Sequence, residues 1–286
     1  MKTPPAIAPL VTDGLVDTVL RRLMSGKEAD VYLVSSQDRI VCAKVYKQAN
    51  QRGFHKAVDY IEGRKTKNSR QARAMAKRSR YGRQEQESAW QSTEVDALRQ
   101  LAAAGVRVPT PYQFYEGVLL MELICDEDGQ PAPRLNDIEL DPHSARKMHQ
   151  QLIRQVVRML CVGVIHGDLS EYNVLVEPDG PVIIDLPQAV DAAANNNAQR
   201  LLSRDVVNLN TYFGRFAPEL LTSQYAPEIW SYYESGKLLP DTPLTGEFDP
   251  TTTAVDLDEI QQVIDDARRE NEAREAGRAA AQESGG

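Results

Sequence analysis

The segment His166–Asn173, with the sequence HGDLSEYN, constrains this 286-residue chain more than any other part of it. It has the form H-x-D-x-x-x-x-N, and two short apolar stretches around a Pro-Asp-Gly turn lead from it to Asp185. These side chains suit phosphoryl transfer, because Asp168 can accept a hydroxyl proton while Asn173 and Asp185 supply hard oxygen ligands for Mg²⁺. Each residue alone is more often a loop cap or a turn acid, but the combination favours the catalytic interpretation.

Lys44 is the second candidate, since it ends an apolar stretch with the sequence VCAK. A buried ammonium is costly unless a carboxylate or phosphate pairs with it. We expect Glu94, on the inward face of a helix predicted over 84–104, to be the partner. Glu87 is a competing acid, and an edge-strand lysine that reaches water is the alternative without a pair.

A third candidate is the stretch 24–32, MSGKEADVY, directly before the first predicted strand. A turn there can place backbone N–H groups and Ser25 over phosphates. It is not a Walker A loop, because Glu28 follows Gly26-Lys27 where Ser or Thr would be needed. Its position ahead of the strand that leads to Lys44 makes the turn before Val31 a candidate phosphate loop.

The hydrophobic pattern predicts a mixed chain of strands and helices without internal repeats. Strands are expected at 31–34, 40–46, 118–124, 174–176 and 182–184, and helices at 84–104, 141–161 and 255–275. Asp141-Pro142 supplies an N-terminal helix signal. The turn-rich stretch 126–133 favours a lobe boundary there.

The residues 52–83 form a basic segment in an acidic chain. They contain eleven Lys or Arg and two acids, whereas the whole chain has a net charge of −8. This excess favours RNA or another acidic partner over a solvated loop, although the few aromatic residues give no support for base stacking. Autophosphorylation at Ser69 or Ser79 within this segment is a further hypothesis.

Composition excludes several classes of protein. The 42% hydrophobic and 26% charged residues are ordinary for a globular domain. The apolar run 159–165 is far short of the ~20 residues that span a bilayer, and the first ten residues do not form a secretory signal. Three widely spaced cysteines without a C-x-x-C pair fit a reducing compartment, so we expect a cytoplasmic protein without a membrane partner.

The motifs SGKEADVY, CAKVYK, HGDLSEYNVLV and IIDLPQAVD, in this order, resemble the RIO atypical protein kinases, and most closely the RIO1-like branch in its bacterial form. The resemblance extends from about residue 12 to 246. It implies an α+β, two-lobed, trimmed protein-kinase-like fold, with a small β-rich N-lobe and a mainly helical C-lobe. The expected organisation is a flexible tail at 1–12, an N-lobe at 13–124 with a flexible insertion at 52–83, a C-lobe at 125–246, and an acidic helix with a frayed tail at 247–286.

The resemblance also implies roles for single residues. Asp168 would be the catalytic acid/base, Asn173 and Asp185 the metal ligands, and Lys44 with Glu94 the ion pair that holds the ATP phosphates. The expected nucleotide-binding residues of the phosphate loop and of the hinge around adenine are Ser25, Gly26, Lys27, Glu28, Ala29, Val31, Met121, Glu122 and Ile124. The cofactors would be ATP and Mg²⁺, with Mn²⁺ as a substitute.

The expected activity is that of an ATP-dependent serine/threonine protein kinase that also phosphorylates itself. One alternative is an ATPase-driven switch in ribosome or RNP assembly, with phosphate transiently on Asp185. A second is a small-molecule phosphotransferase of the aminoglycoside or choline kinase type, and a third is a pseudokinase binding module. Leu186-Pro187 follow Asp185 where an ordinary kinase has Phe-Gly, so the Ala-Pro-Glu triplets at 217–219 and 226–228 are interpreted as helix starts.

Overall fold

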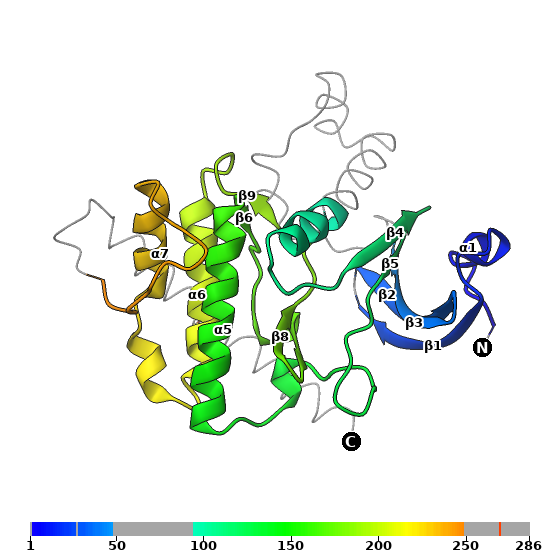
Figure 1. The fold of residues 1–286 in the computed structure, drawn as a ribbon, viewed down its shortest axis with the longest axis horizontal. Coiled ribbons are helices and arrows are strands. Elements are labelled where there is room, and N and C mark those ends of the chain that lie inside the picture. Colours follow the sequence, from blue (N-terminus) through cyan, green and yellow to red (C-terminus); the bar gives the residue numbers. More distant parts are fainter. Residues whose placement is uncertain (1, 27, 48–93, 249–268, 270–286) are drawn as a thin grey trace. The chain divides into compact units, whose positions relative to one another are not determined.

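The computed structural model describes residues 2–26, 28–47, 94–248 and 269 (Figure 1). The chain divides into two compact units, Met1–Ala132 with Val182–Ala189, and Pro133–Pro181 with Val190–Gly286. The sequence predicts a single change of lobe after residue 124. In the structure the chain instead returns to the first unit over Val182–Ala189, the stretch that contains Asp185.

An antiparallel sheet of five strands in the order β1-β2-β3-β5-β4 forms the frame of the first unit. Its elements are α1 (Ala8–Thr12), β1 (Thr18–Ser25), β2 (Ala29–Ser36), β3 (Arg39–Tyr46), a helix at 94–103, β4 (Pro111–Tyr115) and β5 (Val118–Met121). The strands predicted at 31–34 and 40–46 are confirmed, and they pair as a hairpin with a turn at Gln37 and Asp38, both at positive φ. The predicted strand at 118–124 ends earlier, at Met121.

Side chains alternate across β2 and β3, so that the sheet has two different apolar faces. One face carries Val31, Leu33 and Cys42, with Leu23, Met121 and Leu123 packed against them. Lys44 lies on the same face as Cys42, because residues two apart on a strand point the same way. The opposite face is covered by α1.

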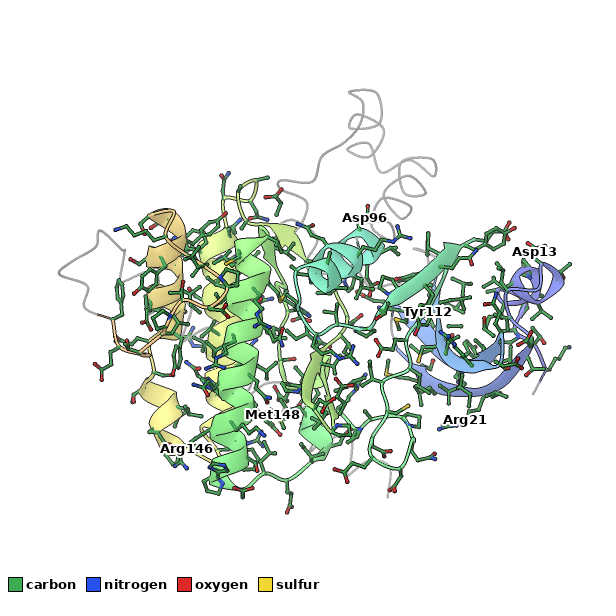
Figure 2. The ribbon with its side chains drawn as sticks, viewed as in Figure 1. Asp13, Arg21, Asp96, Tyr112, Arg146 and Met148 are labelled. Carbon is green, nitrogen blue, oxygen red and sulfur yellow. The ribbon has the colours of Figure 1, made fainter. Side chains whose placement is uncertain are left out.

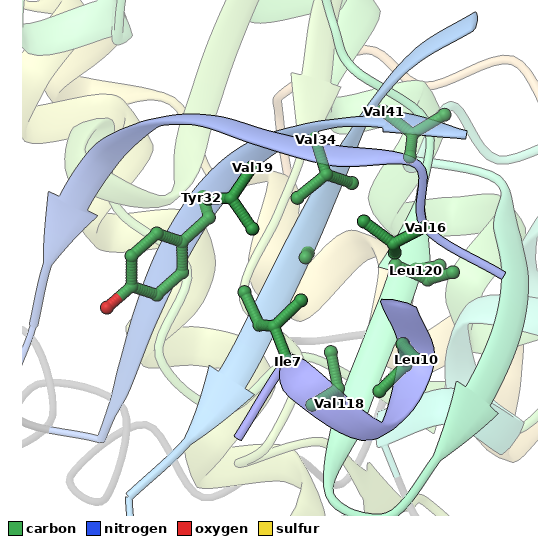
Figure 3. Packing of buried hydrophobic residues seen from close by; sticks show 10 residues of the cluster. Ile7, Leu10, Val16, Val19, Tyr32, Val34, Val41, Val118 and Leu120 are labelled. Atoms are coloured by element: carbon green, nitrogen blue, oxygen red, sulfur yellow. The ribbon is translucent and has the colours of Figure 1, made fainter. Parts of the chain in front are cut away.

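The segment 1–12, expected as a flexible tail, contributes to the hydrophobic core through its described residues. Ile7 and Leu10 are fully buried and pack with Val16, Val34 and their neighbours on the far face of the sheet (Figure 3). Their three-residue spacing puts both on one side of a helical turn. The stretch is too short to give a periodic pattern, which explains the expectation of a tail.

The helix at 94–103 confirms the C-terminal part of the helix predicted over 84–104. Its buried side is formed by Glu94, Val95, Leu98 and Leu101. Asp96 is exposed and forms an i,i+3 ion pair with Arg99 (Figure 2). The rest of the predicted helix lies outside the described residues.

The second unit is mainly helical. Its elements are η2 (Leu135–Asp137), α5 (Pro142–Cys161), β6 (Val164–Ile165), η3 (Glu171–Asn173), β7 (Val174–Glu177), the start of β8 (Gly180–Ile183), β9 (Val190–Asp191), α6 (Ala198–Phe213), η4 (Pro218–Thr222) and α7 (Tyr225–Glu234). Two small sheets pair β6 with β9 and β7 with β8. The expected helix and hairpin on either side of the HGDLSEYN segment are therefore confirmed.

The α5 helix begins and ends where the sequence predicts. The Asp141 carboxylate accepts hydrogen bonds from the backbone N–H groups of His143 at 2.8 Å and Ser144 at 3.1 Å, which is the arrangement of an N-cap. The apolar stripe of this helix, from Ala145 to Leu160, is buried. Both Ala-Pro-Glu triplets mark helix starts, since Pro218 opens η4 and Pro227 lies in the first turn of α7.

Within the described part of the chain, no helix combines the length and the apolar character needed to cross a membrane. The predicted helix at 255–275 and the rest of the acidic segment 247–286 lie outside the described residues, apart from 247, 248 and 269.

Candidate active site

Lys44 is the centre of a charged cluster in the first unit. Its ammonium donates to Glu94 Oε1 at 2.6 Å and to Asp185 Oδ1 at 2.8 Å, and the residue is only 7% exposed. Burial alone would lower the pKa of Lys44, but the carboxylates of Asp185 and Glu94 outweigh it and hold the pKa well above its usual value. The predicted pairing of Lys44 with Glu94 is therefore present, and the ammonium stays charged.

Tyr46, which no sequence motif indicates as a site residue, also belongs to this cluster. Its hydroxyl donates to the second oxygen of the Glu94 carboxylate, Oε2, at 2.6 Å. Burial, with the nearby charge of Glu94, raises the pKa of Tyr46 and keeps the hydroxyl protonated. The K-x-Y spacing on one strand face was the available signal, but tyrosine in a buried strand is usually a packing residue.

Asp185 has a backbone conformation that is uncommon for a residue other than glycine. Its φ is +67°, in the left-handed region that costs a non-glycine residue about 1 kcal/mol. Its side chain is 45% exposed although one oxygen bonds to Lys44. The carboxylate is thus held by Lys44 on one side while much of it remains accessible.

The candidate phosphate loop connects β1 to β2. Gly26 closes it, since its N–H donates to Ala29 O at 2.9 Å. Lys47, directly after β3, was not predicted as part of the site: its ammonium donates to Gly26 O at 2.6 Å and to Ser25 Oγ at 3.3 Å. The loop is therefore tied to the strand that carries Lys44. The backbone oxygen of Glu28 also accepts from the N–H of Lys47, whereas Lys27 lies outside the described residues.

An apolar surface lies on the same side of the sheet as Lys44. It consists of Leu23, Val31, Leu33, Cys42, Met121 and Leu123. Burial, with a smaller contribution from Cys125, raises the pKa of the Cys42 thiol to about 12, so that this position is uncharged and apolar. Such a surface can contact a planar base, as the prediction for Val31 and Met121 requires.

The expected hinge follows β5. The carboxylate of Glu122 is occupied by other residues and does not face a ligand. Arg107 donates to it through two nitrogens at 2.9 Å each, and Thr110 donates through its N–H and its hydroxyl at 3.0 Å. Figure 2 labels Tyr112 on the neighbouring strand β4. Burial acts to raise the pKa of Glu122, but these hydrogen bonds lower it. Ile124 is buried, and its carbonyl oxygen accepts from Ala132 N–H at 2.9 Å. Contacts of Glu122 with a nucleotide would therefore use its backbone.

The loop that contains Asp168 is anchored by Asp205 of α6. The carboxylate of Asp205 accepts from the backbone N–H groups of Gly167 and Leu169, both at 2.8 Å, on either side of Asp168. Gly167 has φ +80°, a conformation that glycine adopts without strain. Burial raises the pKa of Asp205 to about 6, although attraction to His166 and Arg204 acts in the opposite direction.

Two further residues of α6 hold the same loop. Arg204 donates to the backbone oxygen of Gly167, and its guanidinium lies 3.8 Å from Asp168 Oδ1. Asn208 donates to Leu169 O at 2.9 Å and is buried. Neither residue nor Asp205 was predicted, because on sequence alone they are ordinary polar residues of an amphipathic helix.

The residues expected to bind a divalent metal have a suitable donor set. The amide nitrogen of Asn173 donates to Asp168 O at 2.8 Å, which leaves its carbonyl oxygen as the atom that suits a cation. Asp185, in the other unit, has a carboxylate side chain that is 45% exposed. Among the described residues no group of three or more His, Cys, Asp or Glu could hold a metal by itself. Each of the two residues, taken separately, offers an oxygen donor of the kind that a divalent cation prefers.

Several predicted residues lie outside the described part of the chain. They are Lys27, the competing acid Glu87, the basic segment 52–83 and its two serines, Ser69 and Ser79.

In one unit a lysine of an antiparallel sheet pairs with a glutamate of a helix, and a helical unit carries an aspartate–asparagine loop. These features define a protein-kinase-like enzyme. The crystal structure of the Rio2 kinase from Chaetomium thermophilum has the same fold, with a TM-score of 0.56 at 20% identity, over 94% of this chain and 77% of that one.

The family follows from sequence comparison. A model described as the RIO domain matches residues 30–226. The RIO-type serine/threonine-protein kinase Rio1 of Haloferax volcanii is 34% identical over 213 residues, 73% of this chain and 68% of that protein. The serine/threonine-protein kinase rio1 of Schizosaccharomyces pombe is 30% identical over 214 residues, 72% of this chain but only 40% of that protein. The chain therefore belongs to the RIO family of serine/threonine protein kinases, of the RIO1 type, which confirms the resemblance. Membership implies binding of ATP, a divalent metal and a substrate.

Proposed function

We propose that this chain transfers the γ-phosphoryl group of ATP to a serine hydroxyl, on itself or on another protein, with Asp168 as the acid/base. The main support is the anchoring of the Asp168 loop through its own backbone. Asp205 holds the N–H groups on both sides of Asp168, which fixes the direction of a carboxylate that must meet an acceptor hydroxyl.

In the proposed reaction, Asp168 accepts the hydroxyl proton of the acceptor serine as its oxygen forms a bond to the γ-phosphorus. The bond between that phosphorus and the bridging oxygen breaks, and ADP leaves. Lys44, held by Glu94, binds the α- and β-phosphates. Asn173 and Asp185 would hold Mg²⁺, which neutralises phosphate charge when bound; Mn²⁺ is the expected substitute.

The contacts of Lys44 support its part in this proposal. An ammonium with two carboxylates around it keeps its positive charge in a buried position. The apolar surface beside it suits the adenine base, with Met121, Glu122 and Ile124 as the hinge. The phosphate loop would use Ser25, Gly26, Lys27, Glu28 and Ala29.

The test is a labelling assay with purified protein, γ-labelled ATP and Mg²⁺. We expect wild-type protein to label itself with an acid-stable product, and Asp168→Ala to reduce the rate by about 10²- to 10⁴-fold while nucleotide binding persists. Full labelling by Asp168→Ala would show that the acid/base assignment is wrong. An acid-labile product that Asp185→Asn abolishes would instead indicate an acyl phosphate and the ATPase switch.

The partner and the location also remain predictions. The basic segment 52–83 is proposed to contact RNA or another acidic partner on grounds of charge alone. Neutralising Arg73, Lys77, Arg78 and Arg80 should weaken a salt-sensitive interaction without altering ATP binding. A cytoplasmic location is testable by fractionation of cells that express the chain.

A further inference from the structure

The carboxylate of Glu94 has a different donor on each oxygen. Lys44 donates to Oε1 and the hydroxyl of Tyr46 donates to Oε2, both at 2.6 Å. We propose that Tyr46 is a positioning residue for phosphoryl transfer, whose hydroxyl fixes the Glu94 carboxylate so that it holds Lys44 in place for the ATP phosphates. This inference rests on the proposed function, because it concerns the phosphate-binding role of Lys44.

The strand and the packing around it hold the ring of Tyr46 independently of the hydroxyl. Tyr46 is 7% exposed, its N–H donates to Gly117 O at 3.2 Å, and its ring meets Phe114 edge to face at 6.2 Å. These contacts hold the ring in place, so that its hydroxyl points at Glu94. Removing the hydroxyl alone should leave this packing intact.

The same ring also contacts the lysine. The Lys44 ammonium lies 5.4 Å from the centre of the Tyr46 ring, within the range of a cation–π interaction. Tyr46 therefore touches both members of the ion pair, through its face and through its hydroxyl. Tyr46 can therefore restrict the position of Lys44 relative to Glu94 more than the ion pair alone does.

The buried position of Glu94 explains why a second donor matters. The residue is 2% exposed, so an oxygen without a partner would be a buried charged acceptor left unsatisfied. Among the described residues Tyr46 is the donor to Oε2, so without the hydroxyl the carboxylate is free to rotate towards another partner. Rotation moves Oε1 and with it the ammonium of Lys44, and small displacements of a positioning group reduce turnover strongly.

The test is Tyr46→Phe, with Tyr32→Phe as the matched control. Tyr32 has nearly the same burial, at 8% exposed, but packs in the cluster on the opposite face of the sheet. We expect Tyr46→Phe to reduce kcat for self-labelling about tenfold, with KM for ATP changed less than about threefold, since the ion pair is misplaced and not removed. Tyr32→Phe should keep wild-type kinetics.

A double-mutant cycle distinguishes positioning through Glu94 from a general effect on the fold. In a Glu94→Ala background, Tyr46→Phe should have almost no further effect on kcat, because the group that it positions is missing. A second tenfold loss in that background would overturn the proposal, as would wild-type kinetics for Tyr46→Phe or an equal loss for Tyr32→Phe. If Glu94→Ala does not fold, the comparison of the two tyrosine variants decides.

Two reference variants separate this inference from the proposed function. Lys44→Met and Asp168→Ala should both be inactive. If they are inactive while Tyr46→Phe is normal, only the positioning role of Tyr46 is wrong. If they label as well as wild type, or if wild type does not label, the proposed function fails and the inference fails with it.

Discussion

Lys44 and Asp185, 141 positions apart in the sequence, are joined by a hydrogen-bonded ion pair of 2.8 Å. The pair lies within one compact unit, because the chain returns to that unit over Val182–Ala189. Together with Glu94 this gives one ammonium two carboxylate partners, one buried and one partly exposed. The charge of Lys44 therefore stabilises the unit as well as the proposed nucleotide site.

Replacing Lys44 should be costly for stability. Lys44→Met leaves Glu94 as a buried carboxylate with only a hydroxyl donor, so we expect the free energy of unfolding to fall by about 3 kcal/mol. Lys47→Met is the comparison: it removes the more exposed pair with Asp30, at 3.2 Å, and the hydrogen bonds to Gly26 O and Ser25 Oγ. Because these groups are less buried, the loss should be smaller than for Lys44→Met. Urea unfolding of the three proteins measures this, and equal losses would contradict the buried-pair interpretation.

Arg204 should affect turnover more than nucleotide binding. It holds Gly167 through the backbone oxygen and lies beside the Asp168 carboxylate, so Arg204→Met should reduce kcat about tenfold or more, with unchanged affinity for ATP. Arg154→Met, an exposed arginine of α5, is the control and should have no effect. Steady-state kinetics with a separate measurement of ATP binding tests this; a loss confined to affinity would argue against the role.

Asp205 should make the stability of the protein depend on pH. Its pKa rises from 3.8 to about 6 on folding, so the folded state binds a proton between these values that the unfolded state does not. The stabilisation that this bound proton contributes is therefore complete below about pH 4 and is lost as the pH rises through 6. Relative to the non-titrating Asp205→Asn, wild type should be about 2 kcal/mol more stable at pH 4.5 than at pH 7.5.

Unfolding curves of both proteins at the two pH values measure this difference, and titrating groups that do not interact with Asp205 cancel in the comparison. If wild type instead loses stability relative to Asp205→Asn as the pH falls, the folded state prefers the ionised carboxylate with its two backbone donors.

Glu122 and Arg107 should be energetically coupled. Their two-nitrogen contact predicts an interaction energy of about 0.5–1 kcal/mol in a cycle of Glu122→Gln and Arg107→Met. Because the pKa of Glu122 is lowered, the coupling should persist below pH 4.5, the ordinary pKa of the carboxyl group, and disappear as the carboxyl becomes protonated. If the losses in unfolding free energy of the two single variants simply add at pH 7, the contact between Arg107 and Glu122 does not stabilise the fold.

Several features were predictable because they depend on neighbours in the sequence. The cap at Asp141, the stripe of α5 and the β2–β3 hairpin follow from local spacing. The α1 helix was missed because Ile7 and Leu10 form a single turn, whose helical state depends on burial against the sheet.

The proposed site divides in the same way. The residues proposed to do the chemistry were predictable from the sequence, since Lys44, Asp168, Asn173 and Asp185 stand at spacings typical of phosphoryl transfer. What holds them became visible in the fold: Tyr46 donates to Glu94, and the Asp205 carboxylate binds the backbone of the Asp168 loop. Those contacts join groups distant in the sequence. A buried tyrosine or a helix aspartate gives no local sign of its partner, because its hydrogen bonds are set by the packing of other elements.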